Sequence, residues 1–362
     1  MLSKAGAQQP PSPQSVRKDQ LHTPPAADQT FLPSGSQKAA LLEQEKKDIF
    51  ERKASRYDKP SNLTPEQFQA LLKTFHIEEE DFEWLGPVSG GLTNSNFKFT
   101  VTSGPEAGNH FFLRIPGENT ETVINRSQEK KHIDMVETLD LDVPNIFFDC
   151  ESGMKVTRFI DVNSLNQSTV FQNRAAIIAL LHKLHKLPAE GAGASPFDYP
   201  NKLKLYEQQA GAHLNLTFPE YREIRPKVLA LLKQHCRDAG QCLCHNDLVP
   251  DNFLSHQDRL LLIDWEYSGL NDPFFDLASC ALESNLNEQQ TIDFLADYLG
   301  QEPSRSEIQR LRCWQIAQDL LWSAWSAWKI STGVDYREYG QERFQRAIKM
   351  LSIFPPPQTK DR

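Results

Sequence analysis

Cysteine, methionine and long hydrophobic runs are all scarce in this sequence. Only six cysteines and four methionines occur among 362 residues. This is too few cysteines for a disulfide-stapled fold, so we expect a reducing compartment and predict a cytoplasmic location. The longest apolar run, Ala175 to Leu181, is far shorter than the ~20 residues that a membrane-spanning helix needs. The N-terminus also lacks the apolar core of a secretory signal, so we expect neither a membrane protein nor a secreted one.

Positive charge is in short supply as well. Lys and Arg total 39 against 48 Asp and Glu, which gives a net charge of -9. A protein that neutralises nucleic-acid phosphates needs clustered Lys and Arg, so we expect no nucleic-acid partner. An acidic chain is compatible with a small cationic substrate, although net charge describes the whole surface and not one pocket.

Composition divides the chain into a leader and a globular body. Residues 1–40 hold 6 of the 23 prolines and few large apolar side chains, so they cannot bury enough surface to fold. At about 150 residues per domain, the remainder has room for two lobes. We predict four segments: a disordered or loosely helical leader over 1–60, a first lobe over 61–160, a second lobe over 161–353 and a flexible tail over 354–362.

The first lobe has the pattern of a small β-rich unit. Thr64 as an N-cap, Pro65 in the first turn and Gln67 as the capping-box residue predict the start of a helix. Turn residues and apolar alternation predict the other elements of this lobe. We expect strands over 82–88, 96–102 and 110–115, a helix over 122–139, and a hairpin over 145–149 and 154–159.

The second lobe has the pattern of a helical unit. Apolar residues recur at helical spacing from about residue 175 onward, and one β-rich insertion interrupts them over 242–264. The order of elements predicts an α+β, two-lobed fold. A small β-rich lobe precedes a larger, mainly helical lobe, and a cleft is expected between them.

The most informative motif is CHNDLVPDNFL over 244–254, followed by LIDWEY over 262–267. Apolar residues on both sides of a polar turn predict two short paired strands between these motifs. This hairpin would bring Asn252 and Asp264 to the same end, with Asp247 on the loop just before it.

These three side chains suit phosphoryl transfer. A carboxylate such as Asp247 can accept the proton of an attacking hydroxyl, while Asn252 and Asp264 can supply the hard oxygen ligands that Mg²⁺ prefers. Asn252 follows Asp247 by five residues and Asp264 follows Asn252 by twelve, a spacing that matches the catalytic and metal-binding loops of the protein-kinase-like fold. We add His245 to the catalytic group and expect it to hold the loop by hydrogen bonds rather than to transfer protons.

A zinc site at Cys242, Cys244 and His245 is the competing interpretation. Zinc sites usually draw their ligands as two separated pairs, and no second cysteine pair lies nearby in the sequence. The alternation Cys-Leu-Cys is more typical of a strand with small buried side chains, so we disfavour zinc at these three residues.

The first lobe offers a complementary set of groups for nucleotide phosphates. Gly90 and Gly91 lie between two predicted strands, where backbone N–H groups can approach phosphates closely. Arg114 is a charge within the apolar run FLRI, and a buried charge is costly unless it is paired. Glu129 on the next predicted helix is the expected partner, because a cation–glutamate pair of this kind positions nucleotide phosphates in kinases. In isolation, these features are more typical of a plain turn and a surface ion pair, and it is the downstream loop of Asp247 that reverses the preference for the ion pair.

Several segments together resemble the choline/ethanolamine kinase family, within the larger group of aminoglycoside-phosphotransferase-like proteins. They are HNDLVPDNFL, LLIDWEYSGLNDPFFDLAS, GGLTNSNF, FLRIPGENTETVINRSQE and DLLWSAWSAWKISTGVDYREYGQERF. The resemblance runs in collinear order over about 265 residues, from residue 84 to residue 348. It leaves residues 1–60 uncovered.

The resemblance implies an ATP- and Mg²⁺-dependent transfer of the γ-phosphate to the hydroxyl of choline. Asp247 would then be the base, and Asn252 and Asp264 would bind Mg²⁺. The nucleotide would be held by a set of residues from the first lobe: Gly90, Gly91, Thr93, Asn94, Arg114 and Glu129. The alcohol would occupy an aromatic and acidic pocket made by Tyr267, Glu283, Trp322, Trp325 and Tyr339.

Physical reasoning supports the aromatic half of that pocket. A quaternary ammonium cannot donate a hydrogen bond, so it is held by ring faces and nearby carboxylates. Trp322, Trp325 and Trp328 recur at a spacing of three, which gives a partly shared helical face. An aromatic stripe of this kind is also typical of a core, and Trp328 is the most core-like of the three.

Other functions remain compatible with the same motifs. A kinase of this fold could act on ethanolamine, thiamine or an aminoglycoside instead of choline. A catalytically inactive relative could bind a ligand without turning it over. The joint presence of Asp247, Asn252 and Asp264 argues against inactivity, because an inactive relative is free to lose them.

Overall fold

The computed structural model describes residues 57–88, 94–117, 120–188, 193–237 and 240–354. The predicted leader up to residue 56 and the tail from residue 355 lie outside the described residues. None of the described helices is long and apolar enough to cross a membrane.

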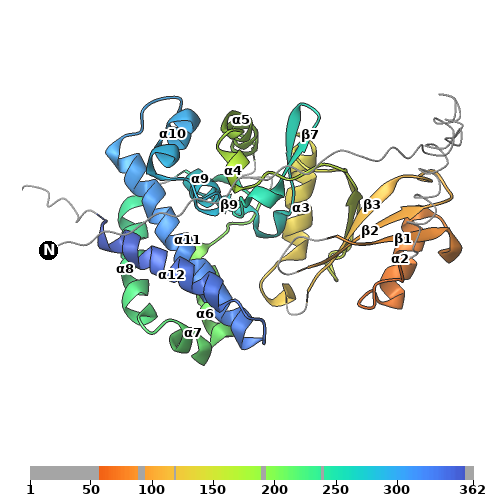
Figure 1. Ribbon diagram of the computed structural model, residues 1–362, viewed down its shortest axis with the longest axis horizontal. Helices are drawn as coiled ribbons and strands as arrows, with labels where there is room; N and C mark the ends of the chain where they lie inside the picture. Colours follow the sequence, from red (N-terminus) through yellow and green to blue (C-terminus); the bar gives the residue numbers. More distant parts are fainter. Residues whose placement is uncertain (1–56, 89–93, 118–119, 189–192, 238–239, 355–362) are drawn as a thin grey trace, which may run out of the picture. The chain divides into compact units, whose positions relative to one another are not determined.

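The small lobe is built on a five-stranded antiparallel sheet (Figure 1). Its strand order is β1-β2-β3-β5-β4, so the last hairpin joins the sheet through its second strand. The strands are β1 (Phe82–Pro87), β2 (Ser95–Val101), β3 (His110–Ile115), β4 (Asn145–Phe148) and β5 (Lys155–Arg158). All five strands that the sequence predicts are present.

Helix α2 (Pro65–Phe75) covers this sheet and begins with the predicted capping box. The Thr64 hydroxyl accepts from the backbone N–H of Gln67, and the Gln67 side chain accepts from the backbone N–H of Thr64. At the other end of the helix, the Phe75 ring lies 5.6 Å from Phe99 and 4.6 Å from Phe111. These aromatic contacts form the core of the small lobe.

Helix α3 (Arg126–Glu137) starts later and ends earlier than predicted. Asn125 is the N-cap of α3, because its side chain accepts from the backbone N–H of Gln128. The sequence analysis did not identify this cap and therefore placed the start of the helix too early. The residues before it form a short 3₁₀ turn over Thr120–Thr122.

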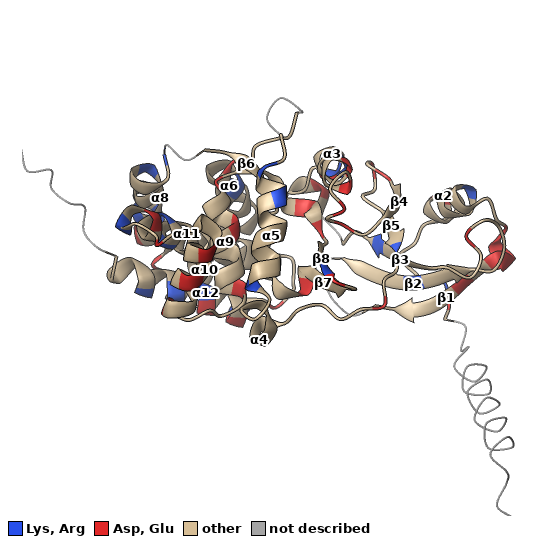
Figure 2. Ribbon diagram, turned by 90° about the horizontal axis from the view of Figure 1, so that it is seen from above, with Lys and Arg blue, Asp and Glu red and all other residues tan. Residues whose placement is uncertain are grey.

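The larger lobe packs its helices around the long helix α11 (Arg305–Ser331) (Figure 1). Helices α6, α8, α9 and α12 contact it on different sides, and most of its residues between Leu311 and Lys329 are buried. The remaining helices are α4 (Gln167–Val170), α5 (Arg174–His185), α6 (Tyr199–Ala210), α7 (Ala212–Thr217), α8 (Tyr221–His235), α9 (Pro273–Glu283), α10 (Glu288–Leu299) and α12 (Arg337–Ser352). Acidic and basic positions are interspersed along these helices (Figure 2).

The β-rich insertion of the larger lobe contains two small sheets. Strands β7 (Phe253–His256) and β8 (Arg259–Leu262) form the predicted hairpin. Strand β6 (Cys242–Cys244) is present where the Cys-Leu-Cys alternation predicts a strand, and it pairs with β9 (Gly269–Asn271). The sequence does not predict β9, because its three residues show no apolar alternation. Gly269 fits this position closely, since a Cβ atom there would lie 3.0 Å from the carbonyl oxygen of Ser195.

Candidate active site

The β7–β8 hairpin brings Asn252 and Asp264 to the same end, as the sequence predicts. Phe253 pairs with Leu262, and the next residues outward are joined by a hydrogen bond from the Ile263 N–H to the Asn252 carbonyl oxygen at 3.0 Å. Asp264 follows with a left-handed backbone, at φ 69°. This conformation is uncommon for a residue other than glycine and is frequent at functional sites.

Asp276 of α9 binds the backbone of the loop that precedes the hairpin. Its carboxylate accepts from the backbone N–H groups of His245 and Asn246, at 2.9 and 2.7 Å. The His245 ring binds the carbonyl oxygen of Ile263 at 2.9 Å, and burial lowers its pKa to about 4. A neutral ring held in this way is compatible with the loop-holding role that the sequence suggests for His245.

Asp247 lies half-buried on this loop, next to other carboxylates. The backbone carbonyl oxygen of Asp247 accepts a hydrogen bond from the side-chain amide of Asn252 at 2.9 Å. Asn252 therefore binds the backbone of Asp247 and not its carboxylate. Burial raises the pKa of the Asp247 carboxyl well above its usual value, and the negative charges of Glu283 and Asp264 raise it further. A positive charge brought to this place would therefore ionise Asp247 more readily.

Arg114 of β3 and Glu129 of α3 form the predicted ion pair. Their side chains meet at 2.6 Å, and both are buried. Arg126 also binds Glu129, at 2.8 Å. Burial alone would lower the pKa of Arg114, but the charges of Glu129 and Glu266 more than offset this and raise it.

Glu266 connects this pair to the larger lobe. Its carboxylate lies 2.7 Å from Arg126 and 3.2 Å from Arg114, and it accepts from the side-chain amide of Asn94 at 3.0 Å. Since Glu266 lies two residues after Asp264, the same contacts fix the small lobe beside the end of the hairpin.

Asp264 completes the group but lacks a hydrogen bond at one oxygen. Its Oδ1 is buried without a hydrogen-bond partner among the described residues, and the nearest cation, Arg114, is 3.6 Å away. Burial and the charge of Glu266 raise the pKa of Asp264 to about 7. An unpartnered carboxylate oxygen close to an amide side chain is a suitable donor set for Mg²⁺. Asp264 and Asn252 could therefore hold this ion.

A cavity of about 540 Å³ lies between the two lobes at this point. Asn252, Asp264, Arg114 and Asn94 are among the residues that line it, together with Phe159 and Ile160 from the connection between the lobes. A volume of this size suits a small ligand such as a nucleotide. Gly90, Gly91 and Thr93, which the sequence also predicts to contact the nucleotide, lie outside the described residues.

The five residues predicted to bind the alcohol form one contact series. The Tyr267 ring lies 5.2 Å from Trp322, Trp322 lies 6.3 Å from Trp325, and Trp325 lies 5.9 Å from Tyr339. The series continues from Tyr339 through Arg343, whose guanidinium lies 4.5 Å above the Tyr339 ring and pairs with Glu283. The structure thus brings together residues that are up to 72 positions apart in the sequence.

Comparisons with known proteins identify the family of this chain. A sequence model described as "phosphotransferase enzyme family" matches residues 84–314. The chain belongs to this phosphotransferase family. Protein LicA of Haemophilus influenzae is 30% identical over 310 residues, which cover 79% of this chain and 87% of that protein.

Two solved structures extend the comparison to the fold. The crystal structure of choline kinase LicA from Streptococcus pneumoniae is 33% identical, with a TM-score of 0.63, covering 74% of this chain and 94% of that one. A crystal structure of LicA in complex with AMP is 30% identical, with a TM-score of 0.67, covering 80% and 98%. The resemblance to the choline/ethanolamine kinases and the two-lobed, protein-kinase-like fold are both confirmed, and the chain is a small-molecule kinase.

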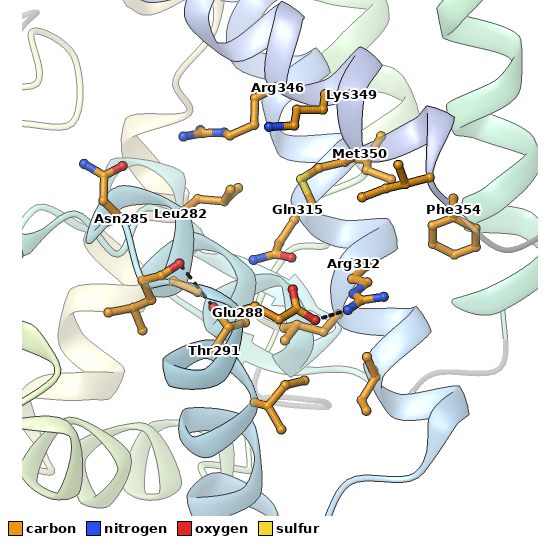
Figure 3. Close-up of a pocket in the computed structure, with 17 residues that line it drawn as sticks. Leu282, Asn285, Glu288, Thr291, Arg312, Gln315, Arg346, Lys349, Met350 and Phe354 are labelled. Carbon is orange, nitrogen blue, oxygen red and sulfur yellow. Dashed lines mark hydrogen bonds and ion pairs between the residues drawn. The ribbon is translucent and has the colours of Figure 1, made fainter.

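A second cavity, about 520 Å³ in volume, is lined by none of these carboxylates. It is enclosed by α9, α10, α11 and α12, and its walls include Leu282, Met350 and the ion pair of Arg312 with Glu288 (Figure 3). None of the predicted site residues lines it. The carboxylates and amides, and not cavity size, therefore locate the candidate active site.

Sequence reasoning missed several groups of this phosphotransferase site. Glu266 and Arg126 complete the buried ion network, Arg343 pairs with Glu283, and Asp276 holds the loop. The sequence does contain one signal for Glu266: it is a charged residue between two aromatic residues, Trp265 and Tyr267, in the DWEY motif. Arg343 lies four residues after Tyr339, the spacing of neighbours on one helix face.

The raised pKa of Asp264 predicts how the metal-free protein responds to pH. In the unfolded chain this carboxyl ionises near pH 4, whereas in the folded protein it keeps its proton up to about pH 7. Its contribution to stability is therefore lost as pH rises from about 4 to about 7. Asp264→Asn removes this penalty, so its Tm relative to wild type should rise over the same interval and then stay constant.

Thermal melts in EDTA between about pH 4.5 and 8 test this prediction. This range covers most of the expected change between about pH 4 and 7 and extends beyond its upper end. Asp258→Asn is the matched control, because Asp258 is exposed in the turn between β7 and β8. A Tm difference between Asp264→Asn and wild type that does not change with pH would contradict it.

Proposed function

We propose that this phosphotransferase transfers the γ-phosphate of ATP to the hydroxyl group of choline, with Mg²⁺ as the metal ion. The observation that carries this proposal is the contact series of Tyr267, Trp322, Trp325 and Tyr339 next to the loop that holds Asp247. Ring faces bind a quaternary ammonium at about 0.5–2 kcal/mol each. The aromatic series and the carboxylates together support an aromatic and acidic pocket for the alcohol.

The nucleotide would occupy the cavity between the lobes. Arg114, fixed by Glu129, would contact its phosphates together with Asn94 and the loop of Gly90, Gly91 and Thr93. The related LicA structure in complex with AMP supports a nucleotide as a ligand of this chain. Asn252 and Asp264 would hold Mg²⁺, which when bound neutralises charge on the phosphates during transfer.

Asp247 would act as the general base. Its carboxylate takes the hydroxyl proton of choline as the alcohol oxygen bonds to the γ-phosphorus. The bond from that phosphorus to the β,γ-bridging oxygen breaks at the same time, and ADP leaves with the electron pair. Because neighbouring negative charges raise the pKa of Asp247, a bound cationic alcohol and metal ion would lower it and ionise the base when both are present. His245 would keep the loop in position.

The ion pair of Glu283 with Arg343 favours choline over ethanolamine as the substrate. Its carboxylate already pairs with Arg343, and Arg343 also lies 3.4 Å from Asp319. A primary ammonium needs free hydrogen-bond acceptors, which this paired carboxylate provides only in part. A trimethylammonium group needs none, since it is held by ring faces and by the general negative charge of the site.

Replacing Asp247 tests the proposed base. Asp247→Asn keeps the shape of the side chain but cannot accept the proton, so we expect kcat to fall by at least ~100-fold. The affinity for ADP should stay the same, because Asp247 contacts the alcohol and not the nucleotide in this proposal. Steady-state kinetics and calorimetric ADP titration make the measurement, with the exposed Asp258→Asn as control. Turnover near that of wild type would remove Asp247 from this role.

Replacing the tryptophans tests the alcohol. Leu at Trp322 or Trp325 keeps an apolar side chain but removes a ring face worth about 1 kcal/mol, so the KM for choline should rise about fivefold. The KM for ATP should hardly change. Trp328→Leu is the matched control, because Trp328 lies on the same helix and stacks on Tyr206 at 5.9 Å, whereas Trp322 and Trp325 contact the rings of Tyr267 and Tyr339.

The same assay compares choline, ethanolamine, thiamine and kanamycin as acceptors, with EDTA as the metal-free reference. We expect choline to have the highest kcat/KM and EDTA to abolish turnover. A preference for another acceptor would contradict the proposed substrate. Equal KM changes for choline and ATP, or the same KM change in Trp328→Leu, would show instead that the tryptophans act through the core.

A further inference from the structure

Two cysteines and a histidine meet behind the loop that carries His245. Cys242 and Cys244 lie on β6, and His185 lies at the end of α5, 57 positions earlier in the chain. Their ligand atoms all lie within 4.8 Å of one another. The sequence suggested only His245 as a neighbouring histidine, and that ring is engaged with Ile263 instead.

The spacing of the two sulfur atoms suits a tetrahedral metal ion. Zinc binds thiolate sulfur at about 2.3 Å, so two thiolates on one tetrahedral ion lie about 3.8 Å apart. The Sγ atoms of Cys242 and Cys244 are 3.6 Å apart. Cys242 and Cys244 are two positions apart on strand β6, so both side chains point to the same face of the strand. Their sulfur atoms reach this separation on a regular strand backbone.

The surroundings of His185 are those of a metal-binding histidine. Its Nε2 faces the carboxylate of Asp276 at 3.1 Å, and its side chain is 5% exposed. Metal-binding histidines characteristically place one ring nitrogen against a carboxylate, which fixes the ring and leaves the other nitrogen for the ion. The other nitrogen, Nδ1, faces the hydroxyl of Tyr298 at 2.8 Å, so an ion bound through Nδ1 would have to displace that hydroxyl from the ring.

We propose that Cys242, Cys244 and His185 form a binding site for a soft divalent cation of the zinc class, with a water molecule or the Tyr298 hydroxyl as fourth ligand. Each thiol releases its proton to solvent as its sulfur binds the ion. Mg²⁺ does not compete, because it prefers oxygen ligands to sulfur. The site is separate from Asn252 and Asp264 and does not depend on the proposed reaction.

The position of the site gives it a structural consequence. An ion bound there links α5 to β6, and β6 leads directly into the loop of His245. Asp276, which orients His185, also accepts from the backbone N–H groups of His245 and Asn246. Because an ion that binds only the folded protein stabilises it, zinc should raise the Tm.

Cobalt titration provides the test, since Co²⁺ bound to thiolates has a charge-transfer absorption that Co²⁺ bound to oxygen lacks. The metal-free protein is kept reduced with a phosphine, which does not bind the ion as thiol reductants do, and Mg²⁺ is present in excess. We expect one Co²⁺ per chain, displaced by Zn²⁺. Cys242→Ser and His185→Gln should each weaken binding by more than about 100-fold, because even the partners of metal ligands are worth 10–100-fold. Cys150→Ser is the control, since Cys150 is an exposed thiol outside the site.

Zinc X-ray absorption on the loaded wild-type protein gives an answer that needs no variant to fold. It should show two sulfur ligands together with nitrogen or oxygen ligands, and the Tm should rise with Zn²⁺ but not with Mg²⁺. Absence of the charge-transfer band, a coordination shell with fewer than two sulfurs, or unchanged binding in folded Cys242→Ser would each overturn the proposal.

Discussion

The candidate active site depends on a buried network of opposite charges that joins the two lobes. Arg114 and Arg126 come from the small lobe, and they meet Glu129 of the same lobe and Glu266 of the larger one at 2.6 to 3.2 Å. Removing one partner from such a network leaves a buried charge unpaired, at a cost of about 3–5 kcal/mol. The small lobe is therefore held where Arg114 lies beside Asp264.

The network does not balance the negative charge that gathers around it. Asp264 lacks a hydrogen-bonded partner at one oxygen, and neighbouring carboxylates together with burial raise the pKa of both Asp247 and Asp264. Arg343 lowers the pKa of Asp247 but offsets the rise only in part, because it also pairs with Glu283 and Asp319. Cations that bind here would remove this repulsion, which is the physical reason for expecting both a metal ion and a cationic alcohol at one site.

Local patterns predicted most of the fold and one half of the ion network. The strands, the capping box of Thr64 and the hairpin that aligns Asn252 with Asp264 all depend on residues close together in the sequence. The pair of Arg114 with Glu129 was predictable because a charge in an apolar strand requires a partner.

Long-range contacts were not predictable in the same way. Glu266 lies 140 positions from Arg126, and His185 lies 57 positions from Cys242, so no local periodicity connects them. Strand β9 is too short to show alternation. The start of α3 is a local feature that the sequence analysis missed, because Asn125 caps the helix through Gln128, three residues away. The long-range contacts follow from packing, between the lobes for Glu266 and within the larger lobe for His185, and they complete the ion network and the proposed soft-metal site.

The most direct measurement of the central claim is the affinity for ADP with and without Mg²⁺, by isothermal titration calorimetry on the whole chain. If excess carboxylate charge at Asp264 requires a divalent cation before phosphates can approach, ADP should bind at least about tenfold more tightly with saturating Mg²⁺ than in EDTA, a difference of about 1.4 kcal/mol or more. Equal affinity under the two conditions would contradict the account, because it would mean that the carboxylates near Arg114 do not resist the phosphates.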